Sequence, residues 1–480
     1  MKVDSKMDQS KFDVIVIGAG SGGLNIATFT NRIGLSTLLI DKSDANIGGD
    51  CLNFGCVPSK ALIHIAKEVR AGRKLEQFGI TTTGEVDMRA VMSYVKGRQD
   101  IIREHESADW FRKKGMTVAL GLATFVGPHA VKVGETIYSG RKIILATGSR
   151  PRTITLPGME RVPVFNNESI FNIDFLPKNL VIIGGGPIGV EIGQAFGSLG
   201  SQVTILEKSE KFLPKEDREI AEVLYRRLVS YGVEICFNVE AEEIGSDGLL
   251  RVRVGAEEQS IKIDALFVSI GRELNIDSLA LDKAGIEQDT SGHKLKVDPY
   301  LRTTNKDVLV CGDVVGQYQF THVAELHASV IIKNLFSPFK TKLTNDHLAW
   351  VTFTDPEIAT FGLQEGELKE RGIKYEVLRQ GFGDDDRAIT DDYREGLLKL
   401  FVNKKGKILG GSMVANNAGE LIQELILAQT KGLTLAGLFT KIYPYPTATR
   451  VNKRIAGNYL GRKLTTGVIK FLRLLYSIVN

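Results

Sequence analysis

Two cysteines, Cys51 and Cys56, stand five positions apart in the stretch GGDCLNFGCVPSK, which covers residues 48–60. The chain has four cysteines in all, and Cys236 and Cys311 lie in apolar runs typical of buried strands. A proline and a helical run follow Cys56, which predicts that this thiol lies at a helix N-terminus. The positive end of a helix dipole lowers a thiol pKa. We therefore interpret Cys51 and Cys56 as a redox pair.

A metal clip and an inert buried pair are the alternatives for these cysteines. A structural zinc site usually needs four ligands in paired short spacings, and His64 is the only other cysteine or histidine close by. We expect His64 to pack or to face solvent. The acidic stretch GDDDRAIT, residues 383–390, lacks the fixed pattern of a hard-cation loop and is predicted to be a solvated turn. No metal site is predicted.

A glycine-rich turn joins a strand to a helix in FDVIVIGAGSGGLNIATFTNRIGLSTLLID. Gly18 makes the tight turn, Gly20 lets a pyrophosphate approach the backbone, and Gly23 allows close packing of the helix on the strand. The amides at the helix N-terminus then hold the anion. Asp41 ends the next strand and can accept a hydrogen bond from a ribose hydroxyl. This unit predicts a dinucleotide site.

The pattern recurs in NLVIIGGGPIGVEIGQAFGSLGSQVTILEKSE. Its three glycines and its closing acid are Gly184, Gly186, Gly189 and Glu207. Glu207 would repel a 2′-phosphate, which favours NADH over NADPH even though Lys208 and Lys211 are near. Two dinucleotide sites beside a cysteine pair indicate an electron relay, from a nicotinamide through a flavin to a disulfide.

Further motifs follow in the order ILATGSRP, VSIGRELN, VLVCGDV, FTHVAE and FTDPEIATFG. With GAGSGG, GGDCLNFGCVPSK and GGGPIGVE, this series resembles the FAD-dependent pyridine nucleotide-disulfide oxidoreductases, the family of dihydrolipoamide dehydrogenase, glutathione reductase and mercuric reductase. The resemblance runs nearly the whole chain. It implies an α/β fold with two Rossmann-like domains, one for FAD and one for NAD(P), and a C-terminal α+β dimerisation domain. It also implies a homodimer in which this last domain completes the partner's active site.

The resemblance further implies roles for individual residues. Cys56 is the thiol next to the flavin, Cys51 is the outer thiol that attacks the substrate, and Lys60 pairs with Glu191 beside the flavin. Asp313 binds the FAD ribityl region. The remaining cofactor-binding residues implied by the family motifs are Gly49, Thr147, Gly148, Gly271, Gly312 and Ala324.

One motif departs from the family. Members that exchange thiols carry a His-Glu couple in the form HxHPxxxE, where this chain reads YPYPTATR, with Tyr445 at the histidine and Arg450 at the glutamate. No histidine follows His347. A positioned general acid-base contributes roughly 10²–10⁴ in rate, and a tyrosine with an ordinary pKa of about 10 is no base at neutral pH. Efficient lipoamide or glutathione turnover is therefore not expected.

A mercuric-reductase-like branch, with tyrosine in place of that histidine, resembles this pattern most, although the chain lacks the terminal cysteine pair of those enzymes. We predict an enzyme that passes electrons from NADH, with NADPH less favoured, through FAD and the Cys51–Cys56 disulfide to an unidentified small-molecule acceptor. That acceptor is a disulfide, a metal thiolate or a quinone. The alternatives are dihydrolipoamide dehydrogenase and, from another class, a flavin-bound redox sensor or membrane-associated module.

A net charge of +4 over 480 residues gives no reason to expect a nucleic-acid partner, because a binding face for nucleic acid would need a clustered basic patch. The N-terminal stretch MKVDSKMDQSKFD lacks the apolar core of a signal peptide, which predicts a cytoplasmic protein. The basic, apolar tail from Arg462 onward is expected to pack on the dimer partner or to touch an anionic membrane surface weakly. The predicted divisions are 1–150 (FAD domain, first part), 151–275 (NAD(P) domain), 276–342 (FAD domain, second part) and 343–480 (dimerisation domain).

Overall fold

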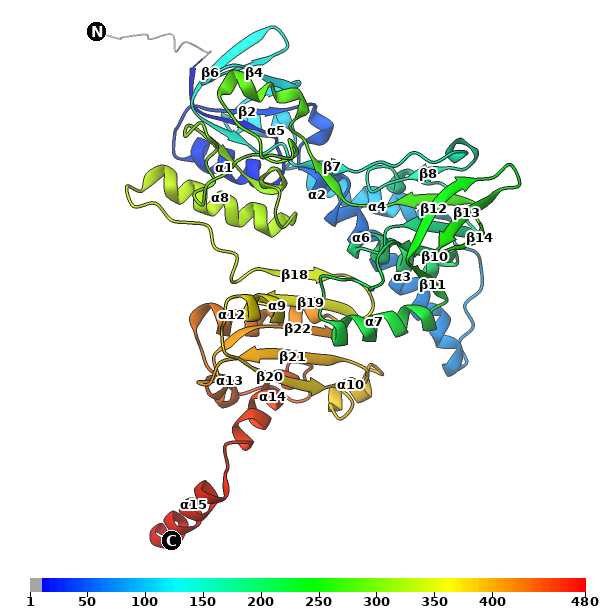
Figure 1. The fold of residues 1–480 in the computed structure, drawn as a ribbon, viewed down its shortest axis with the longest axis vertical. Coiled ribbons are helices and arrows are strands. Elements are labelled where there is room, and N and C mark those ends of the chain that lie inside the picture. Colours follow the sequence, from blue (N-terminus) through cyan, green and yellow to red (C-terminus); the bar gives the residue numbers. More distant parts are fainter. Residues whose placement is uncertain (1–10) are drawn as a thin grey trace. The chain divides into compact units, whose positions relative to one another are not determined.

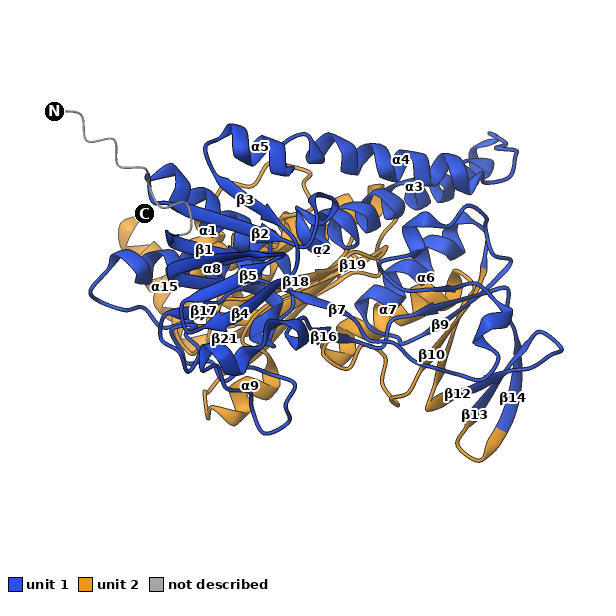
Figure 2. Cartoon of the chain, turned by 90° about the horizontal axis from the view of Figure 1, so that it is seen from above, with its two compact units in different colours: residues 1–201, 241–253, 258–343 blue, residues 202–240, 254–257, 344–480 orange. Residues whose placement is uncertain are grey.

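The computed structural model of the chain describes residues 11–480 (Figure 1). The first ten residues, which hold most of the stretch used above to argue against a signal peptide, lie outside this part. The chain forms two compact units, distinguished by colour in Figure 2. Unit 1 runs to Ser201 and includes residues 241–253 and 258–343; unit 2 comprises residues 202–240, 254–257 and 344–480.

Unit 1 is built on a seven-stranded sheet with a parallel centre. Its strands, in spatial order, are β3 (Thr117–Leu120), β2 (Thr37–Asp41), β1 (Lys11–Ile17), β6 (Thr136–Leu145), β5 (Ala130–Val133) and β4 (Ala123–Gly127), with β17 (Val308–Val310) paired to β6. The run VIVI in β1 is buried along its whole length because its two faces lie in different cores. Val14 and Val16 share a core with helical residues such as Ile26, whereas Ile15 and Ile17 share one with β4 and β5. Strand β1 lies between β2 and β6 and is parallel to both.

Helices and smaller sheets complete unit 1. The helices are α1 (Ser21–Arg32), α2 (Gly49–Asn53), α3 (Cys56–Lys74), α4 (Met88–Arg103), α5 (Ala108–Lys113), α6 (Pro187–Leu199) and α8 (Thr321–Phe336). The further strands are β7 (Ser149–Pro151), β8 (Val164–Phe165), β9 (Asn179–Ile183), β12 (Val239–Ile244), β13 (Leu249–Val254), β14 (Glu257–Lys262), β15 (Ala265–Val268) and β16 (Arg272–Leu274); the terminal residues 239–240, 254 and 257 of β12 to β14 fall in unit 2. Strand β15 pairs in parallel with both β8 and β9, and helix α6 follows β9 as α1 follows β1. Two strand–glycine turn–helix units are therefore present.

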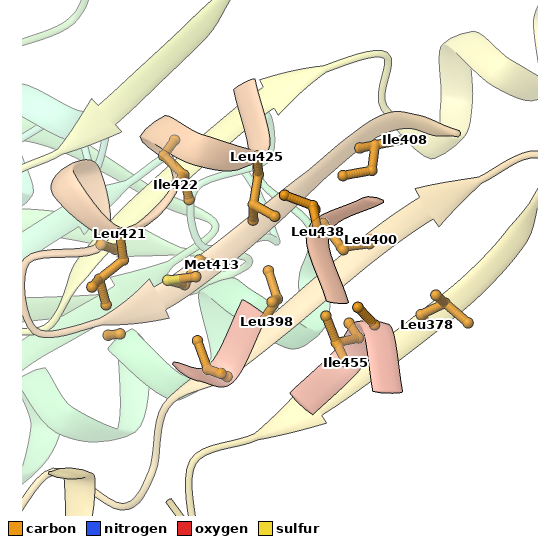
Figure 3. Packing of buried hydrophobic residues seen from close by; sticks show 14 of the residues in the cluster. Leu378, Leu398, Leu400, Ile408, Met413, Leu421, Ile422, Leu425, Leu438 and Ile455 are labelled. Atoms are coloured by element: carbon orange, nitrogen blue, oxygen red, sulfur yellow. The ribbon is translucent and has the colours of Figure 1, made fainter. Parts of the chain in front are cut away.

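Unit 2 contains a five-stranded antiparallel sheet in the order β18-β19-β22-β21-β20. Its strands are β18 (Ala349–Thr352), β19 (Glu357–Gly362), β20 (Glu376–Gly381), β21 (Leu397–Val402) and β22 (Ile408–Ala415), and a parallel pair is formed by β10 (Gln202–Glu207) and β11 (Val233–Phe237). Its helices are α7 (Arg218–Ser230), α9 (Glu365–Glu370), α10 (Asp386–Thr390), α11 (Ala418–Leu421), α12 (Gln423–Lys431), α13 (Leu435–Thr440), α14 (Arg450–Gly461) and α15 (Thr466–Val479). Figure 3 shows the aliphatic core that the sheet shares with α11 to α14.

Helix α7 packs against strands β19, β21 and β22 of this sheet. The Lys399 ammonium on β21 is almost fully buried there, with its Nζ 2.7 Å from both Asp217 Oδ2 and Glu219 Oε1. A buried ammonium must be paired in this way, because an isolated charge is costly to remove from water. The parallel sheets with glycine turns and the separate C-terminal α+β region confirm the predicted α/β fold class.

The chain ends with helix α15, and every residue from 461 to 480 is exposed. Among residues 11–480, no helix is both long enough and apolar enough to cross a bilayer.

Candidate active site

The two cysteines of the predicted redox pair lie at the junction of α2 and α3, both in unit 1. Helix α3 begins at Cys56, as the proline two positions later predicts, so the thiol lies at the positive end of the helix dipole. Both cysteines are free thiols here, Cys51 half-buried and Cys56 exposed. The structure therefore describes the reduced form of the pair.

The surroundings of the two thiols lower the pKa of Cys56 and raise the pKa of Cys51. A hydrogen bond from Cys51 is the main reason that the pKa of Cys56 falls to about 6. Burial opposes this shift, while the hydroxyl of Thr321, with Oγ1 3.3 Å from Cys56 Sγ, and the charge of Lys60 support it. The same contact and burial raise the pKa of Cys51 far above its usual range. At neutral pH the pair is thus a Cys56 thiolate beside a Cys51 thiol.

Lys60 and Glu191 form an ion pair close to the thiols. Lys60 follows Cys56 by one helical turn and points to the same side of α3. Its Nζ lies 2.7 Å from Oε2 of Glu191, whose side chain is only 8% exposed and belongs to α6, which packs on α3. The two residues implied by the resemblance to pair are therefore in direct contact, although 131 positions separate them.

A chain of polar contacts that sequence reasoning missed runs from the cysteine segment to Asp313. Arg272 donates to Asp50 Oδ1 at 3.0 Å and to Ser149 Oγ at 2.7 Å, and Ser149 in turn donates to Asp313 Oδ2 at 2.6 Å. Burial raises the pKa of Asp313, against the hydrogen bond from Ser149 and the charge of Arg272. Two signals pointed here: Asp50 directly precedes Cys51, and an arginine follows the glycine of VSIGRELN.

The first glycine turn is packed so tightly that larger residues do not fit. Gly18 has φ +106°, and a Cβ there would meet the carbonyl oxygen of Ala146 at 2.2 Å. A Cβ at Gly23 would meet the carbonyl oxygen of Gly18 at 2.0 Å. These contacts bring α1 onto β1 as the dinucleotide interpretation requires.

Three further observations in this region fit a bound FAD. A Cβ at Gly49 (φ +63°) would lie 2.6 Å from the Cα of Gly20, so the two backbones leave the entrance to α1 free of side chains. Asp41, at the end of β2, accepts a hydrogen bond from the Ala19 amide at 2.7 Å, and burial raises its pKa. The hydroxyl of Thr147 is buried and has no hydrogen-bond partner within residues 11–480. A polar ligand would supply that missing partner.

Three other predicted cofactor residues adopt the positive φ angles that favour glycine. The positive φ angles of Gly148, Gly271 and Gly312 are +69°, +107° and +80°, and a Cβ at Gly312 would lie 3.4 Å from that of Ala324.

The second glycine turn repeats the packing of the first. Gly184 has φ +106°, and a Cβ there would meet the carbonyl oxygen of Ser269 at 2.4 Å. A Cβ at Gly189 would meet the carbonyl oxygen of Gly184 at 2.1 Å, whereas nothing lies within 4 Å of one at Gly186. In unit 2, Glu207 ends β10 and accepts a hydrogen bond from the Ser209 amide at 2.8 Å.

Tyr445 and Arg450, which replace the family's His-Glu couple, contact each other in unit 2. The Arg450 guanidinium lies 5.2 Å from the centroid of the Tyr445 ring, which is 67% exposed. The Tyr445–Pro446 peptide bond is cis. This pair offers an aromatic face and a positive charge in place of the imidazole and carboxylate of the family's couple.

The residues outside the predicted site have ordinary structural surroundings. His64 is exposed and stacks on Tyr94, with ring centroids 6.1 Å apart. Asp385 of the acidic stretch caps α10 by accepting from the Arg387 and Ala388 amides. In the described part of the chain, no group of three or more His, Cys, Asp and Glu side chains could hold a metal ion.

Comparisons with known proteins define the class. Residues 12–328 match the family model for pyridine nucleotide-disulphide oxidoreductases, and residues 348–455 match the dimerisation domain of that family. The chain therefore belongs to the pyridine nucleotide-disulphide oxidoreductases, which confirms the predicted family and the prediction of an enzyme. Membership implies FAD and a pyridine nucleotide as cofactors, and the dimerisation domain indicates a homodimer.

Individual relatives have different activities. A mercuric reductase of Staphylococcus aureus is 30% identical over 442 residues, which cover 91% of this chain and 80% of that protein. A dihydrolipoyl dehydrogenase of Buchnera aphidicola is 33% identical over 454 residues, covering 90% and 93%. Among solved structures, the HOCl-induced flavoprotein disulfide reductase RclA from Escherichia coli has a TM-score of 0.82 at 28% identity, over 93% of this chain and 99% of that one; its Cu(II) complex is similar, with a TM-score of 0.81.

Proposed function

We propose that this enzyme passes electrons from NADH through FAD and the Cys51–Cys56 disulfide to a thiolate-binding metal ion. The observation that carries the proposal is the exposed Cys56 thiolate and its Cys51 partner in a chain that has Tyr445 where thiol-exchanging relatives place a histidine. A metal thiolate accepts electrons without a proton delivered to a leaving sulfur. One similar protein is named a mercuric reductase, and a second, itself named a disulfide reductase, has a Cu(II) complex, so a metal acceptor has precedent among the similar proteins beside a disulfide.

The side chains around the cysteines suit reductive opening of the disulfide. When bound, FAD supplies two-electron transfer between the nicotinamide and the sulfur atoms. As the sulfur–sulfur bond breaks, Cys56 leaves as the thiolate, stabilised by Cys51, Thr321 and Lys60. Cys51 takes up one proton, because its raised pKa keeps it a thiol. Cys51 is then the outer nucleophile, and as its sulfur bonds to the acceptor its proton passes along the hydrogen bond to the Cys56 thiolate.

Steady-state NADH oxidation with a panel of acceptors tests the proposal. We expect turnover with Hg(II) thiolates or Cu(II), a loss of at least 100-fold in Cys56→Ser, and little activity with dihydrolipoamide and NAD⁺. Dihydrolipoamide turnover at the ordinary rate of the family would instead establish the dihydrolipoamide dehydrogenase alternative. Reduction by NADH without multiple turnovers on any metal, disulfide or quinone would favour the redox-sensor alternative.

A paired variant tests the role of the missing base. Tyr445→His combined with Arg450→Glu rebuilds the family's couple, so dihydrolipoamide turnover should rise by roughly 10²–10⁴. Metal-dependent turnover should change little, because that reaction uses no such proton transfer. Arg450→Glu alone is the matched control and should leave dihydrolipoamide turnover low. An unchanged double variant would contradict our interpretation of Tyr445.

We also propose NADH as the donor. The Glu207 carboxylate would repel a 2′-phosphate, and the two nearby lysines already pair with acids. Lys208 Nζ lies 2.6 Å from Glu240, and Lys211 Nζ lies 3.7 Å from Glu210. The ratio of kcat/KM values for NADH and NADPH tests this choice. Glu207→Ala should lower the ratio of kcat/KM for NADH to that for NADPH. A wild-type preference for NADPH would overturn the proposal of NADH as the donor.

A cytoplasmic site of action is part of this proposal. The cytosol keeps thiols reduced, so a cysteine pair in a cytosolic protein is more often catalytic than structural, as proposed for Cys51 and Cys56. Cell fractionation followed by immunoblotting tests it, and recovery outside the cytoplasmic and cytoplasmic-membrane fractions would contradict it.

A further inference from the structure

Helix α15 (Thr466–Val479) contributes no side chain to the core of unit 2. None of its residues is buried, and the same holds for the whole stretch 461–480. The helix has a defined start, because Thr465 caps it by accepting from the Val468 amide at 3.4 Å. Figure 1 shows it as the last element of the chain. Because none of the α15 side chains is buried, packing within unit 2 does not explain why this helix is so apolar.

The sequence of α15 is strongly amphipathic. Thr466, Lys470, Arg473 and Ser477 are spaced by four, three and four positions and therefore form one polar stripe. Apart from Gly467, every other position is apolar. These side chains are between 39% and 77% exposed, and they are Val468, Ile469, Phe471, Leu472, Leu474, Leu475, Tyr476, Ile478 and Val479. The apolar face thus covers more than half of the helix surface, and its narrow polar stripe carries only positive charge.

The charge of the surrounding segment is equally one-sided. Glu424 is the last acidic residue of the sequence, so residues 425–480 contain none of the 57 acidic residues. They contain nine of the 61 basic ones: Lys431, Lys441, Arg450, Lys453, Arg454, Arg462, Lys463, Lys470 and Arg473. The remainder of the chain is net acidic. The positive charge of the protein is therefore concentrated next to its exposed apolar helix.

We propose that α15 binds the surface of an anionic lipid bilayer. Its apolar face would enter the boundary between headgroups and acyl chains, while Lys470 and Arg473 remain near the lipid phosphates. A helix of this length lies about 21 Å along the membrane plane. This inference is independent of the electron acceptor proposed above.

Two observations favour lipid over a second copy of the chain as the occupant of this face. The match to the family's dimerisation domain ends at residue 455, before α15 begins. The face is also uniformly apolar, with cations beside it and no acid that would pair with the cations of another tail. In a homodimer two such helices are tethered, so weak contacts to one membrane reinforce each other.

Flotation of the full-length, FAD-loaded protein with lipid vesicles tests the proposal. We expect the protein to float with vesicles of phosphatidylglycerol and phosphatidylcholine, much less with phosphatidylcholine alone, and less as salt rises. Lys470→Gln and Arg473→Gln should each reduce the partition coefficient about fivefold, since each cation contributes about 1 kcal/mol. Protein that stays in solution with the anionic vesicles would overturn the proposal.

A matched pair of apolar substitutions isolates the helix. Phe471→Asp should abolish flotation, whereas Phe339→Asp alters an even more exposed phenylalanine, 85% against 57%, outside α15 and should leave flotation unchanged. NADH-dependent turnover without vesicles should be the same in both variants and shows that each is folded. A change of the dimer to monomer in Phe471→Asp, measured by sedimentation, would overturn the proposal in favour of a protein-covered helix.

Discussion

Asp50 Oδ1 accepts a hydrogen bond from Arg272 at 3.0 Å, so the residue directly before Cys51 is tied to the end of the polar chain that reaches Asp313. The Arg272 side chain is only 10% exposed. A charged contact of this kind fixes the geometry of the cysteine segment more firmly than a neutral hydrogen bond would. It also places a carboxylate beside the two thiols, and that negative charge raises the pKa of both Cys51 and Cys56.

Asp50→Asn should lower the pKa of Cys56 further. The asparagine keeps an oxygen that accepts from Arg272 but removes the negative charge that disfavours the thiolate. The pH dependence of Cys56 alkylation in the reduced protein measures the effect, with Cys51 and its thiol left in place. Asp44→Asn, which removes a carboxylate away from the thiols, is the control. An alkylation profile that moves to higher pH in Asp50→Asn would contradict this electrostatic account.

The Cys56 thiolate should be detectable directly. In the wild type we expect alkylation of the reduced enzyme to be fast above pH 6 and to be lost as the pH falls through about 6, where the thiolate takes up a proton. Thr321→Val removes the hydroxyl 3.3 Å from Cys56 Sγ at nearly constant volume and should shift this midpoint to higher pH. Cys51→Ser should shift it too, because Cys51 is the largest cause of the depression. Midpoints near the ordinary thiol range in the wild type would refute the assignment.

The contact between Lys60 and Glu191 should be measurable as a coupling energy. Lys60→Met takes a positive charge away from a carboxylate whose side chain is 8% exposed, and it should destabilise the protein by about 1–3 kcal/mol. Glu191→Gln removes the carboxylate charge that Lys60 neutralises. The double variant should therefore lose less unfolding free energy than the sum of the losses in the two single variants. Urea unfolding of all four proteins gives the cycle. Strict additivity would mean that the 2.7 Å contact contributes nothing to stability.

Gly49→Ala should release FAD. The new methyl group would meet the Gly20 Cα at 2.6 Å and would also force φ +63° on an alanine. Gly79→Ala is the matched control, because Gly79 has φ +78° but nothing lies within 4 Å of its Cβ position. Both variants bear the backbone cost of about 1–2 kcal/mol, but only the first disturbs the nucleotide turn. The ratio of flavin to protein absorbance after gel filtration distinguishes them, and equal retention would show that this close approach is dispensable.

Local features of the site were predictable from sequence, whereas contacts between distant segments were not. The proline two positions after Cys56 predicts the start of α3, and glycine spacing predicts both nucleotide turns, because these depend on backbone sterics within a few residues. The Lys60–Glu191 contact followed only from family resemblance, since no local pattern reports on a partner 131 positions away.

The Asp50–Arg272 contact escaped prediction altogether. It joins residues 222 positions apart, and it depends on the pairing of β16 with β7, which sets Arg272 opposite Pro151 and lets its guanidinium reach Ser149. The position of Arg450 over the Tyr445 ring was also missed, because the sequence shows which residues replace the family's couple but not the path of the intervening turn. The domain divisions and the individual site roles stay predictions.

The buried Lys399 ammonium sets a limit on how this protein can be dissected. Its carboxylate partners, Asp217 and Glu219, precede it by 182 and 180 positions. A recombinant fragment that starts near residue 343 would contain Lys399 without either acid. The Lys399 ammonium on the β-sheet would then have lost both carboxylate partners. Crystallographers who want the C-terminal region alone should therefore graft Asp217 and α7 onto it or replace Lys399 with methionine.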